Sequence, residues 1–296
     1  MDLITIGHII YDIRCYVEDF PTPDKTTFTK TEIQSSGGGS AANVAVGSVK
    51  LGLKAGVIGN VGTDEIGALL FRDLRLSRVD VSRVNVVKGK TGIAIILINK
   101  HAEVEVVEMI GMSEPIIDID VDYIKTCKHL HMTGTNLDAL EIASEAAKKS
   151  GVPVSFDPGR SKSHFGLQKL SKIINNCNYL IVNSTELKFI TGENDVNAGI
   201  KKLKQEFDIT CIIKSGKNPV LVAGKDTFEV EPFKVQAVDT IGAGDAFCAG
   251  FITYLLEKKS LKDSVRFANA VAAAKVQHVG AQSVPDRKEI EKMLKL

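Results

Sequence analysis

The chain has 296 residues, of which 44% are hydrophobic and 25% charged, and this ordinary globular composition excludes a disordered or collagen-like chain. Its 37 lysines and arginines nearly balance 36 acidic residues, so no charge excess favours nucleic acid or a membrane surface as a partner. The five cysteines are scattered, and the first residues lack the pattern of a signal peptide. These features favour a cytoplasmic protein with reduced thiols. No apolar run is long enough to span a bilayer.

The first third of the chain holds strand-like segments in an irregular order. Residues 3–6 form an apolar run that ends at Gly7, which is typical of a buried strand. Three further runs have strand character, at residues 26–34, 91–99 and 103–109. We expect these extra strands to form a small separate sheet that covers one edge of the main domain. This lid would comprise about residues 11–34 and 88–110.

In the rest of the chain, helices alternate with apolar strands. Asp64 and Asp138 can each cap a helix. Strands are expected at residues 152–156, 179–182 and 209–213. Such alternation implies crossover connections and a parallel sheet. We therefore predict an α/β fold in one domain, residues 1–296, whose mostly parallel central sheet carries helices on both faces.

The segment from Asp239 to Phe247 reads Asp-Thr-Ile-Gly-Ala-Gly-Asp-Ala-Phe. It follows an alternating run at residues 229–235 and precedes an apolar helix at 247–256. The amides of Gly242, Ala243 and Gly244 would be the unpaired N–H groups of the helix start, which form an anion site. Asp245 lies in the same turn and could accept a proton from a hydroxyl. The alternative is an aspartate that only stabilises the helix N-terminus.

A second glycine-rich segment, Gly37-Gly38-Gly39, enters a helix that runs to about residue 51. Its glycines allow close backbone approach to a polar ligand, and Asn43 can exchange hydrogen bonds with hydroxyl groups. The same residues loosely match the dinucleotide fingerprint GxGxxA, so an NAD-dependent oxidoreductase is a distant alternative.

Together the two segments resemble the signature motifs of the PfkB/ribokinase family of carbohydrate kinases. The N-terminal pattern is met by Gly38, Gly39, Ala41, Asn43, Ala45, Gly52 and Gly62. The C-terminal pattern is met by Asp239 to Phe247. The resemblance implies a ribokinase-like fold, use of ATP with Mg²⁺, Asp245 as general base, and the amides of residues 242–244 as anion hole.

The resemblance also implies roles for individual residues elsewhere in the chain. The acceptor would be bound by Asp12, Gly38, Gly39 and Asn43. The nucleotide would be bound by Asn183, Glu186, Lys214, Gly216, Thr240 and Asn269, with Glu186 organising Mg²⁺ through water. Asp239 and Ser283 could contribute to a site for a monovalent cation such as K⁺.

Some residues depart from the ribokinase pattern or stand outside it. Ser40 replaces a lysine, and Gly134 begins the stretch where a sugar-binding glutamate is expected, which puts ribose itself in doubt. Arg160 follows the strand at 152–156 and could clamp a carboxylate or phosphate of the substrate. The pattern Cys127-x-His129-x-His131 could bind a metal, but it is more typical of a buried strand.

We therefore expect a kinase that transfers the γ-phosphoryl group of ATP to a primary hydroxyl of a sugar or sugar-like substrate, such as a sugar acid. A nucleoside kinase of the same fold and a non-catalytic sugar- or nucleotide-binding regulator are the alternatives. The lid has a partly apolar second face, so a homodimer formed through the lid is expected as well.

Overall fold

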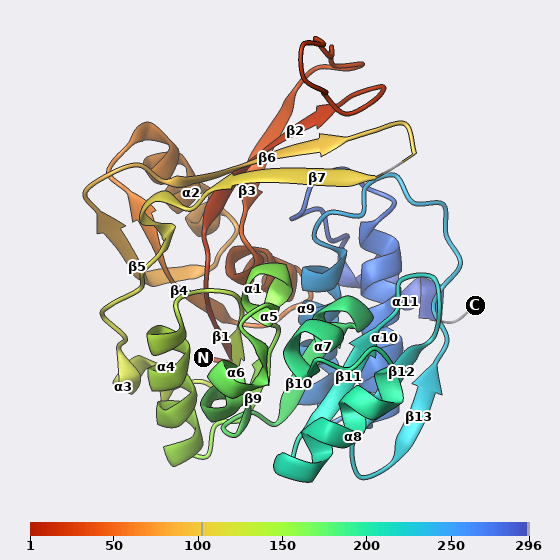
Figure 1. Ribbon diagram of the computed structural model, residues 1–296. Coiled ribbons are helices and arrows are strands. Elements are labelled where there is room, and N and C mark those ends of the chain that lie inside the picture. Colours follow the sequence, from red (N-terminus) through yellow and green to blue (C-terminus); the bar gives the residue numbers. More distant parts are fainter. Residues whose placement is uncertain (102, 295–296) are drawn as a thin grey trace.

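The computed structural model describes residues 1–101 and 103–294. Its main sheet has the strand order β13-β12-β11-β10-β9-β8-β1-β4-β5 (Figure 1). The strands are β1 (Leu3–Ile6), β4 (Ala55–Gly62), β5 (Asp80–Val87), β8 (His129–Met132), β9 (Val154–Phe156), β10 (Tyr179–Asn183), β11 (Thr210–Lys214), β12 (Val220–Ala223) and β13 (Thr227–Val230). Neighbouring strands are parallel from β5 to β11, and β12 and β13 add an antiparallel edge.

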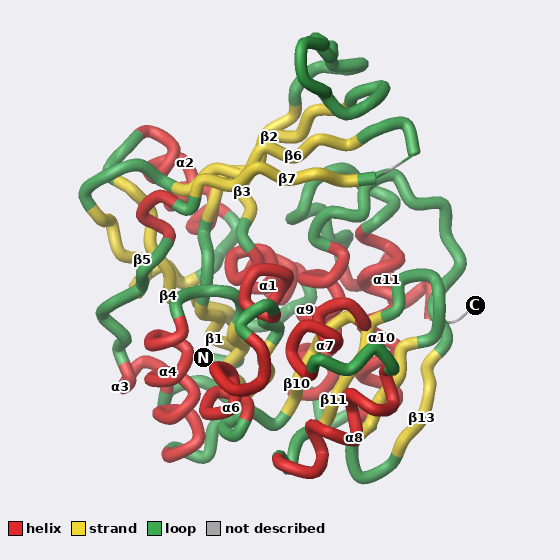
Figure 2. The backbone as a smooth tube through the Cα atoms, viewed as in Figure 1, coloured by secondary structure: helices red, strands yellow, loops and turns green. Residues whose placement is uncertain are grey.

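Helices cover both faces of this sheet, as Figure 2 shows by secondary structure. One face carries α1 (Ser40–Lys50), α2 (Glu65–Leu76), α9 (Ala243–Leu256), α10 (Leu261–Lys275) and α11 (Arg287–Leu294). The other carries α3 (Val121–Ile124), α4 (Leu137–Lys149), α6 (Gly166–Ile174), α7 (Ser184–Thr191) and α8 (Val196–Glu206). Each layer encloses its own apolar cluster. The predicted fold class is confirmed.

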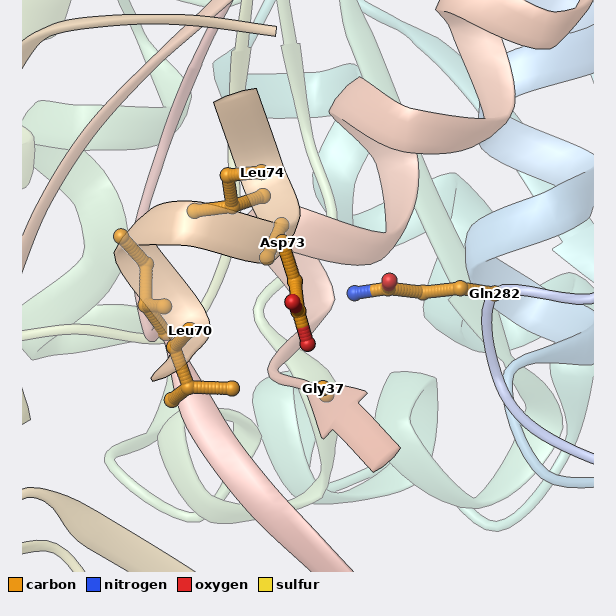
Figure 3. Close-up of a pocket in the computed structure, with 8 residues that line it drawn as sticks. Gly37, Leu70, Asp73, Leu74 and Gln282 are labelled. Atoms are coloured by element: carbon orange, nitrogen blue, oxygen red, sulfur yellow. The ribbon is translucent and has the colours of Figure 1, made fainter. Parts of the chain in front are cut away.

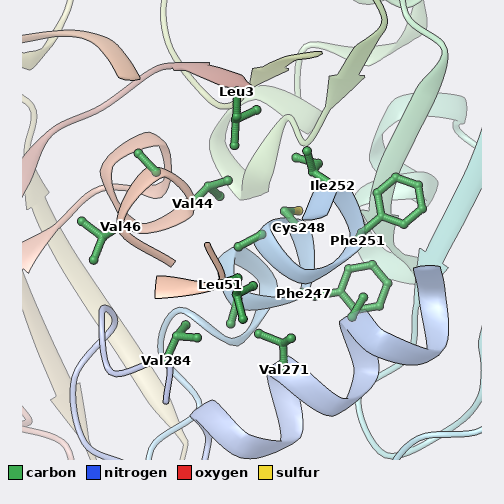
Figure 4. Packing of buried hydrophobic residues seen from close by; sticks show 14 of the residues in the cluster. Leu3, Val44, Val46, Leu51, Phe247, Cys248, Phe251, Ile252, Val271 and Val284 are labelled. Carbon is green, nitrogen blue, oxygen red and sulfur yellow. The ribbon is translucent and has the colours of Figure 1, made fainter. Parts of the chain in front are cut away.

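The packing of α1 against α9 brings the two glycine-rich segments together. Both helices are buried through most of their length, and small residues such as Gly47 and Ala249, which contact each other, let them approach closely. Figure 4 shows Val44 of α1 near Cys248 and Ile252 of α9, with Val271 of α10 completing the cluster. Because each helix begins at a glycine-rich segment, the two N-termini meet at the carboxyl edge of the sheet.

A second, four-stranded sheet stands apart from the main one, in the order β3-β2-β6-β7 (Figure 1). Its strands are β2 (Ile10–Tyr16), β3 (Gln34–Gly38), β6 (Gly92–Ile98) and β7 (Val104–Met109). The predicted runs at 91–99 and 103–109 are therefore confirmed as strands. The predicted strand at 26–34 is wrong, because its alternation of polar residues offers no apolar face to bury. Phe28 is 80% exposed there, and an isolated bridge joins Thr29 to Val17.

Other local predictions are corrected at their boundaries. The helix α4 is capped by Asn136, and Asp138 lies in its first turn rather than at the cap. The alternating run at 229–235 leaves the sheet after Val230. The histidines at 129 and 131 are buried core residues that share the Ser155 hydroxyl at 2.8 Å each. In the described part of the chain no helix is long and apolar enough to cross a membrane, and the five cysteines are unpaired.

Asp64 caps α2 as predicted and also ties the helix to the start of β6. Its carboxylate accepts hydrogen bonds from the Gly67 N–H at 3.0 Å, the Thr91 N–H at 3.1 Å and the Thr91 hydroxyl at 2.5 Å. We expect Asp64→Ala to lower the free energy of unfolding by about 1–2 kcal/mol or slightly more, because a cap and a second bonded group are lost together. Urea unfolding measures this, and Asp64→Asn is the control that retains part of the cap.

Candidate active site

The two signature motifs meet through a direct hydrogen bond. The Asn43 Nδ2 on α1 donates to the Asp245 Oδ2 on α9 at 2.8 Å, across 202 residues of sequence. Both side chains lie in the first turns of their helices. The Asn43 Oδ1 is buried and has no partner among the described residues, so it can accept a hydrogen bond from a ligand hydroxyl.

The start of α9 presents backbone N–H groups beside Asp245. Gly242 caps the helix with φ 77°, and a Cβ there would lie 2.7 Å from the Ala281 carbonyl oxygen, so only glycine fits this turn. The Ala243 N–H donates to the Thr240 carbonyl at 3.1 Å. The N–H groups of Gly242 and Gly244 have no acceptor among the described residues. Two of the three predicted amides therefore stay available for an anion.

Burial shapes the titration of the central carboxylate. It raises the pKa of Asp245 to about 6, and the nearby Asp157 carboxylate acts in the same direction. The hydrogen bond from Asn43 opposes the shift because it favours the charged form. A carboxyl group with a pKa near 6 is ionised at neutral pH yet remains a usable base.

Asp12 approaches the glycine pair from the small sheet. It lies on β2 and is 4% exposed, and a Cβ at Gly38 would overlap its carboxyl group. This contact explains why glycine is needed at position 38. Burial raises the pKa of Asp12 to about 7, against the opposing charge of Arg14.

Lys214 is placed at the site, and its partner was not predicted from the sequence. Its Nζ lies 2.5 Å from the Asp157 Oδ2, and a Cβ at Gly244 would be 3.2 Å from the same nitrogen. Asp157 follows β9 directly, at the edge of the sheet where ligands bind in this architecture. The ammonium group therefore stands beside the start of α9, held there by a carboxylate.

Glu186 closes a capping box with Asn183 at the start of α7. The Glu186 Oε2 accepts the Asn183 N–H at 2.8 Å, and the Asn183 Oδ1 accepts the Glu186 N–H at 2.9 Å. Burial raises the pKa of Glu186, and the Asp157 carboxylate contributes to the shift. Two carboxylates that disfavour each other's charge suit a divalent cation, which would relieve the repulsion.

In the described part of the chain, the remaining residues that were predicted to bind ligands make no side-chain hydrogen bond with Asn43 or Asp245. Arg160 is exposed on the short helix α5 (Gly159–Ser163), and the carboxylate of Asp157 pairs with Lys214 instead of with it. Asn269 is buried, and its amide donates to the carbonyls of Val230 and Glu231, so it holds the end of β13. Gly216 and Thr240 are both exposed in loops at this edge of the sheet.

The residues around Asp239 do not fit a free monovalent cation. The carboxylate of Asp239 accepts the Ile241 N–H at 2.9 Å and the Gly280 N–H at 2.8 Å. Lys275, which is fully buried, donates its Nζ to the Asp239 carbonyl at 2.9 Å and lies 4.0 Å from Oδ1. Ser283 donates its hydroxyl to the Gly280 carbonyl at 2.6 Å. A covalently attached ammonium group thus already supplies positive charge at this place.

A charged cluster was not predicted from the sequence. It lies beside the glycine-rich segment Ser36-Gly37-Gly38-Gly39, which we call the acceptor segment. The Glu114 carboxylate contacts the His8 Nε2 at 2.8 Å and the Lys162 Nζ at 3.0 Å. His8 lies two residues after the end of β1, and a Cβ at Gly134 would lie 3.4 Å from the Lys162 Cγ. These groups occupy the neighbourhood where the sequence lacks the expected sugar-binding glutamate.

The acceptor segment is also contacted by the loop between α10 and α11, residues 276–286, which we call the C-terminal loop. In Figure 3, Gln282 reaches from that loop toward Gly37, with Asp73 and Leu70 of α2 nearby. The cavity that these residues line has a volume of only about 10 Å³. A larger hollow of about 700 Å³ lies near Gly52, Lys54 and Arg78, at the C-terminal end of α1, and neither Asn43 nor Asp245 lines it.

An α/β domain of this topology, with two glycine-rich helix starts joined at one carboxylate, is the architecture of an ATP-dependent sugar kinase. The chain belongs to the pfkB family of carbohydrate kinases, whose family model matches residues 1–288. The family that the sequence motifs indicated is therefore confirmed.

Relatives that are named for different substrates match nearly the whole chain. An ATP-dependent ribose-1-phosphate kinase of Halopiger xanaduensis is 34% identical over 288 residues, which cover 96% of this chain and 94% of the relative. A nucleoside kinase of Methanothermobacter thermautotrophicus is 28% identical over 296 residues, 98% and 94% of the two chains. The structure of Arabidopsis thaliana ribokinase complexed with ribose and ATP superposes with a TM-score of 0.87 at 26% identity, over 100% of this chain and 99% of the other.

Proposed function

We propose that this protein transfers the γ-phosphoryl group of ATP to a primary hydroxyl of a sugar-like acceptor, with Asp245 as general base. The hydroxyl oxygen forms a bond to the γ-phosphorus, the bond from that phosphorus to the bridging oxygen breaks, and ADP leaves. The hydroxyl proton passes to the Asp245 carboxylate. The observation that carries the proposal is the Asn43–Asp245 hydrogen bond beside the N–H groups of Gly242 and Gly244.

The charge that develops on the transferring group is stabilised from two sides. The amides of residues 242–244 contribute from the start of α9, with the Ala243 N–H shared with the Thr240 carbonyl. Lys214 adds a full positive charge beside Gly244. Asp157 keeps this ammonium in place while the site is empty of nucleotide, and the phosphates then compete for it.

The nucleotide is expected along the edge formed by β10, β11 and the start of α9. Asn183, Lys214, Gly216, Thr240 and Asn269 would line it, with Asn269 acting through the backbone of Val230 and Glu231. Asp157 and Glu186 would hold Mg²⁺ through water, and the ion would neutralise phosphate charge when bound. We assign no monovalent cation, because Lys275 already supplies charge at Asp239.

The acceptor would lie between the small sheet and the start of α1. Asp12 and the Asn43 Oδ1 are the hydrogen-bonding groups for its hydroxyls, and Gly38 and Gly39 leave the space that the Asp12 carboxyl group and the His8 carbonyl occupy. A nucleoside acceptor is the second candidate. Gly134 stands where a sugar-binding glutamate is expected, with Lys162 beside it, and a similar chain is named a nucleoside kinase.

We further propose that the small sheet is a lid that excludes water from the reaction; it takes in the expected segments, about residues 11–34 and 88–110, and extends to Gly38 at the end of β3. Its outer face exposes Ile95, Val107 and Met109. Contact with the same face of a second copy would bury these side chains, which supports a homodimer formed through the lid.

A coupled ADP-release assay tests the proposed function. We expect turnover with one class among pentoses, pentose 1-phosphates, hexoses, keto-deoxy acids and nucleosides, with Asp245→Asn as the blank. Saturation by nucleosides alone would replace the sugar acceptor by the second candidate. Binding of ATP and sugar without ADP release from any acceptor would instead identify a non-catalytic binding protein.

A further inference from the structure

Arg14 is a buried cation on the inner face of the small sheet. It is 2% exposed and, two residues after Asp12 on β2, it points to the same side of the strand. Its Nη2 donates to the Ser36 hydroxyl at 2.9 Å. Its Nε and Nη1 have no hydrogen-bond partner in the part of the chain that the structure describes.

The guanidinium lies where the acceptor segment, the small sheet and the C-terminal loop meet. Ser36 precedes the three glycines of the acceptor segment, and a Cβ at Gly280 would lie 3.7 Å from the Arg14 Nη2. Ile241, directly before the helix cap Gly242, packs against the apolar residues of the small sheet. Arg14 is thus enclosed between the groups proposed to bind the acceptor and those proposed to bind the phosphoryl group.

Nearby carboxylates do not satisfy this cation. The closest is Asp12, whose Oδ2 is 3.8 Å from the Arg14 Nη1, beyond hydrogen-bond distance. Burial also raises the pKa of Asp12 to about 7, which weakens its charge near neutral pH. The Asp239 carboxylate is already bonded to the N–H groups of Ile241 and Gly280, and Lys275 adds positive charge next to it.

A buried guanidinium with unpaired donors destabilises the folded protein. Such a group is retained where a bound ligand supplies the missing partners. The ligand must carry negative charge and several acceptor oxygens, because a planar guanidinium donates in a fork. Phosphate has both properties. A neutral sugar hydroxyl would satisfy one donor but leave the charge without a counterion.

We propose that Arg14 binds a phosphate group inside the active site. The proposal rests on the proposed function and deepens it by stating the chemistry of a ligand. The phosphate belongs either to an acceptor that is already phosphorylated or to the nucleotide. Arg14 shares a strand with Asp12 and a hydrogen bond with the acceptor segment, so a pentose 1-phosphate is one arm of the test and ATP is the other.

The test compares the wild type with Arg14→Met, which keeps the length of the side chain and removes its charge. Arg14→Lys keeps the charge without the fork, and Arg72→Met, on the exposed face of α2, is the matched control. The first readout is the Tm without ligand. We expect Arg14→Met to raise it by a few degrees, about 2–4 °C per kcal/mol, because an uncompensated charge leaves the interior.

The second readout is calorimetric binding of ribose, ribose 1-phosphate, ATP and inorganic phosphate. We expect Arg14→Met to weaken at least one phosphate-bearing ligand by about 10- to 150-fold and to leave ribose unchanged. Loss for ribose 1-phosphate alone assigns the acceptor phosphate, and loss for ATP alone assigns the nucleotide. Arg14→Lys should bind with an affinity between those of Arg14→Met and the wild type. The control Arg72→Met should bind as the wild type does.

A lower Tm for Arg14→Met together with unchanged affinity for every phosphate compound overturns the proposal, since Arg14 would then be a structural cation. The binding readout needs no turnover. If the wild type releases no ADP with any acceptor, the proposed function fails while the role of Arg14 is still decided by calorimetry.

Discussion

Asp245→Asn is expected to lower kcat by about 10²–10⁴-fold, the range in which a positioned general base contributes. The amide cannot accept the hydroxyl proton, although it retains the shape of the carboxylate and can still contact the Asn43 side chain. The amides at the start of α9 and Lys214 remain in place, so ATP binding should change much less than kcat. A coupled ADP-release assay with a saturating acceptor measures the first effect, and calorimetry measures the second.

The same variant has a pH signature whose sign follows from the raised pKa. Burial brings the pKa of Asp245 to about 6, above its ordinary value of 3.8. Turnover by the wild type should therefore fall as pH drops below about 6, because the base becomes protonated. Between pH 3.8 and about 6 the folded protein binds more protons than the unfolded chain, so Asp245 makes stability decrease as pH rises through this window.

Asp245→Asn removes that decrease, so above pH 6 the variant is expected to unfold at a higher Tm than the wild type. The pKa of Asp12 is about 7 partly because the Asp245 carboxylate repels its charge, so Asp245→Asn also lowers the pKa of Asp12 and adds to the expected rise in Tm. Thermal unfolding from pH 4 to pH 8 measures the difference. Undiminished turnover in Asp245→Asn, or a lower Tm at pH 8, would contradict the assignment of Asp245 as a general base with a raised pKa.

The fold was predictable because the signals that define it are local. The apolar runs before Gly7 and at 179–182 correspond to β1 and β10, and Asp64 caps α2 as expected. The failures have a common cause. Residues 26–34 alternate without an apolar face, and β5 carries polar residues at half of its positions in an irregular order, so hydrophobic periodicity predicts a strand where there is none and misses one that exists.

The candidate site was predicted from its motifs, and Lys214 and Glu186 were predicted with it, but the ion pairs of Lys214 and Lys275 were not. Asn43 and Asp245 belong to recognisable patterns, and they do meet. Asp157, by contrast, is one carboxylate after a strand, and its partner Lys214 lies 57 residues away. Lys275 ends an alanine-rich helix and resembles a solvated lysine until the packing of α10 encloses it.

Arg14 is the exception, because the sequence holds a usable signal for it. The period of a strand places Asp12 and Arg14 on one face, so an acceptor-binding carboxylate implies a buried arginine two residues later. What the sequence cannot supply is the enclosure of the guanidinium, whose Nε and Nη1 lack hydrogen-bond partners among the described residues, since this depends on Ser36 and Gly280 meeting from distant parts of the chain.

Lys275→Met is expected to lower the free energy of unfolding by about 3–5 kcal/mol, the cost of removing one partner from a buried charged pair. The change leaves the fully buried Asp239 carboxylate without its ammonium neighbour and deprives the Asp239 carbonyl of a donor. Because Asp239 also holds the Ile241 N–H directly before the helix cap, turnover should fall with stability. Urea unfolding and ADP release measure the two effects, and Lys262→Met, at the exposed start of α10, is the control.

Lys275→Ala opens space as well as removing charge. This variant therefore tests whether the Lys275 ammonium group takes the place of a free monovalent cation. If the ammonium replaces a free monovalent cation, the wild type should have the same activity in KCl and in tetramethylammonium chloride. The alanine variant should regain activity and stability with rising KCl concentration, since K⁺ can enter the space beside Asp239 and tetramethylammonium is too large. Activation of the wild type by K⁺, or no difference between the two salts in the variant, would show that Lys275 does not act as a tethered cation.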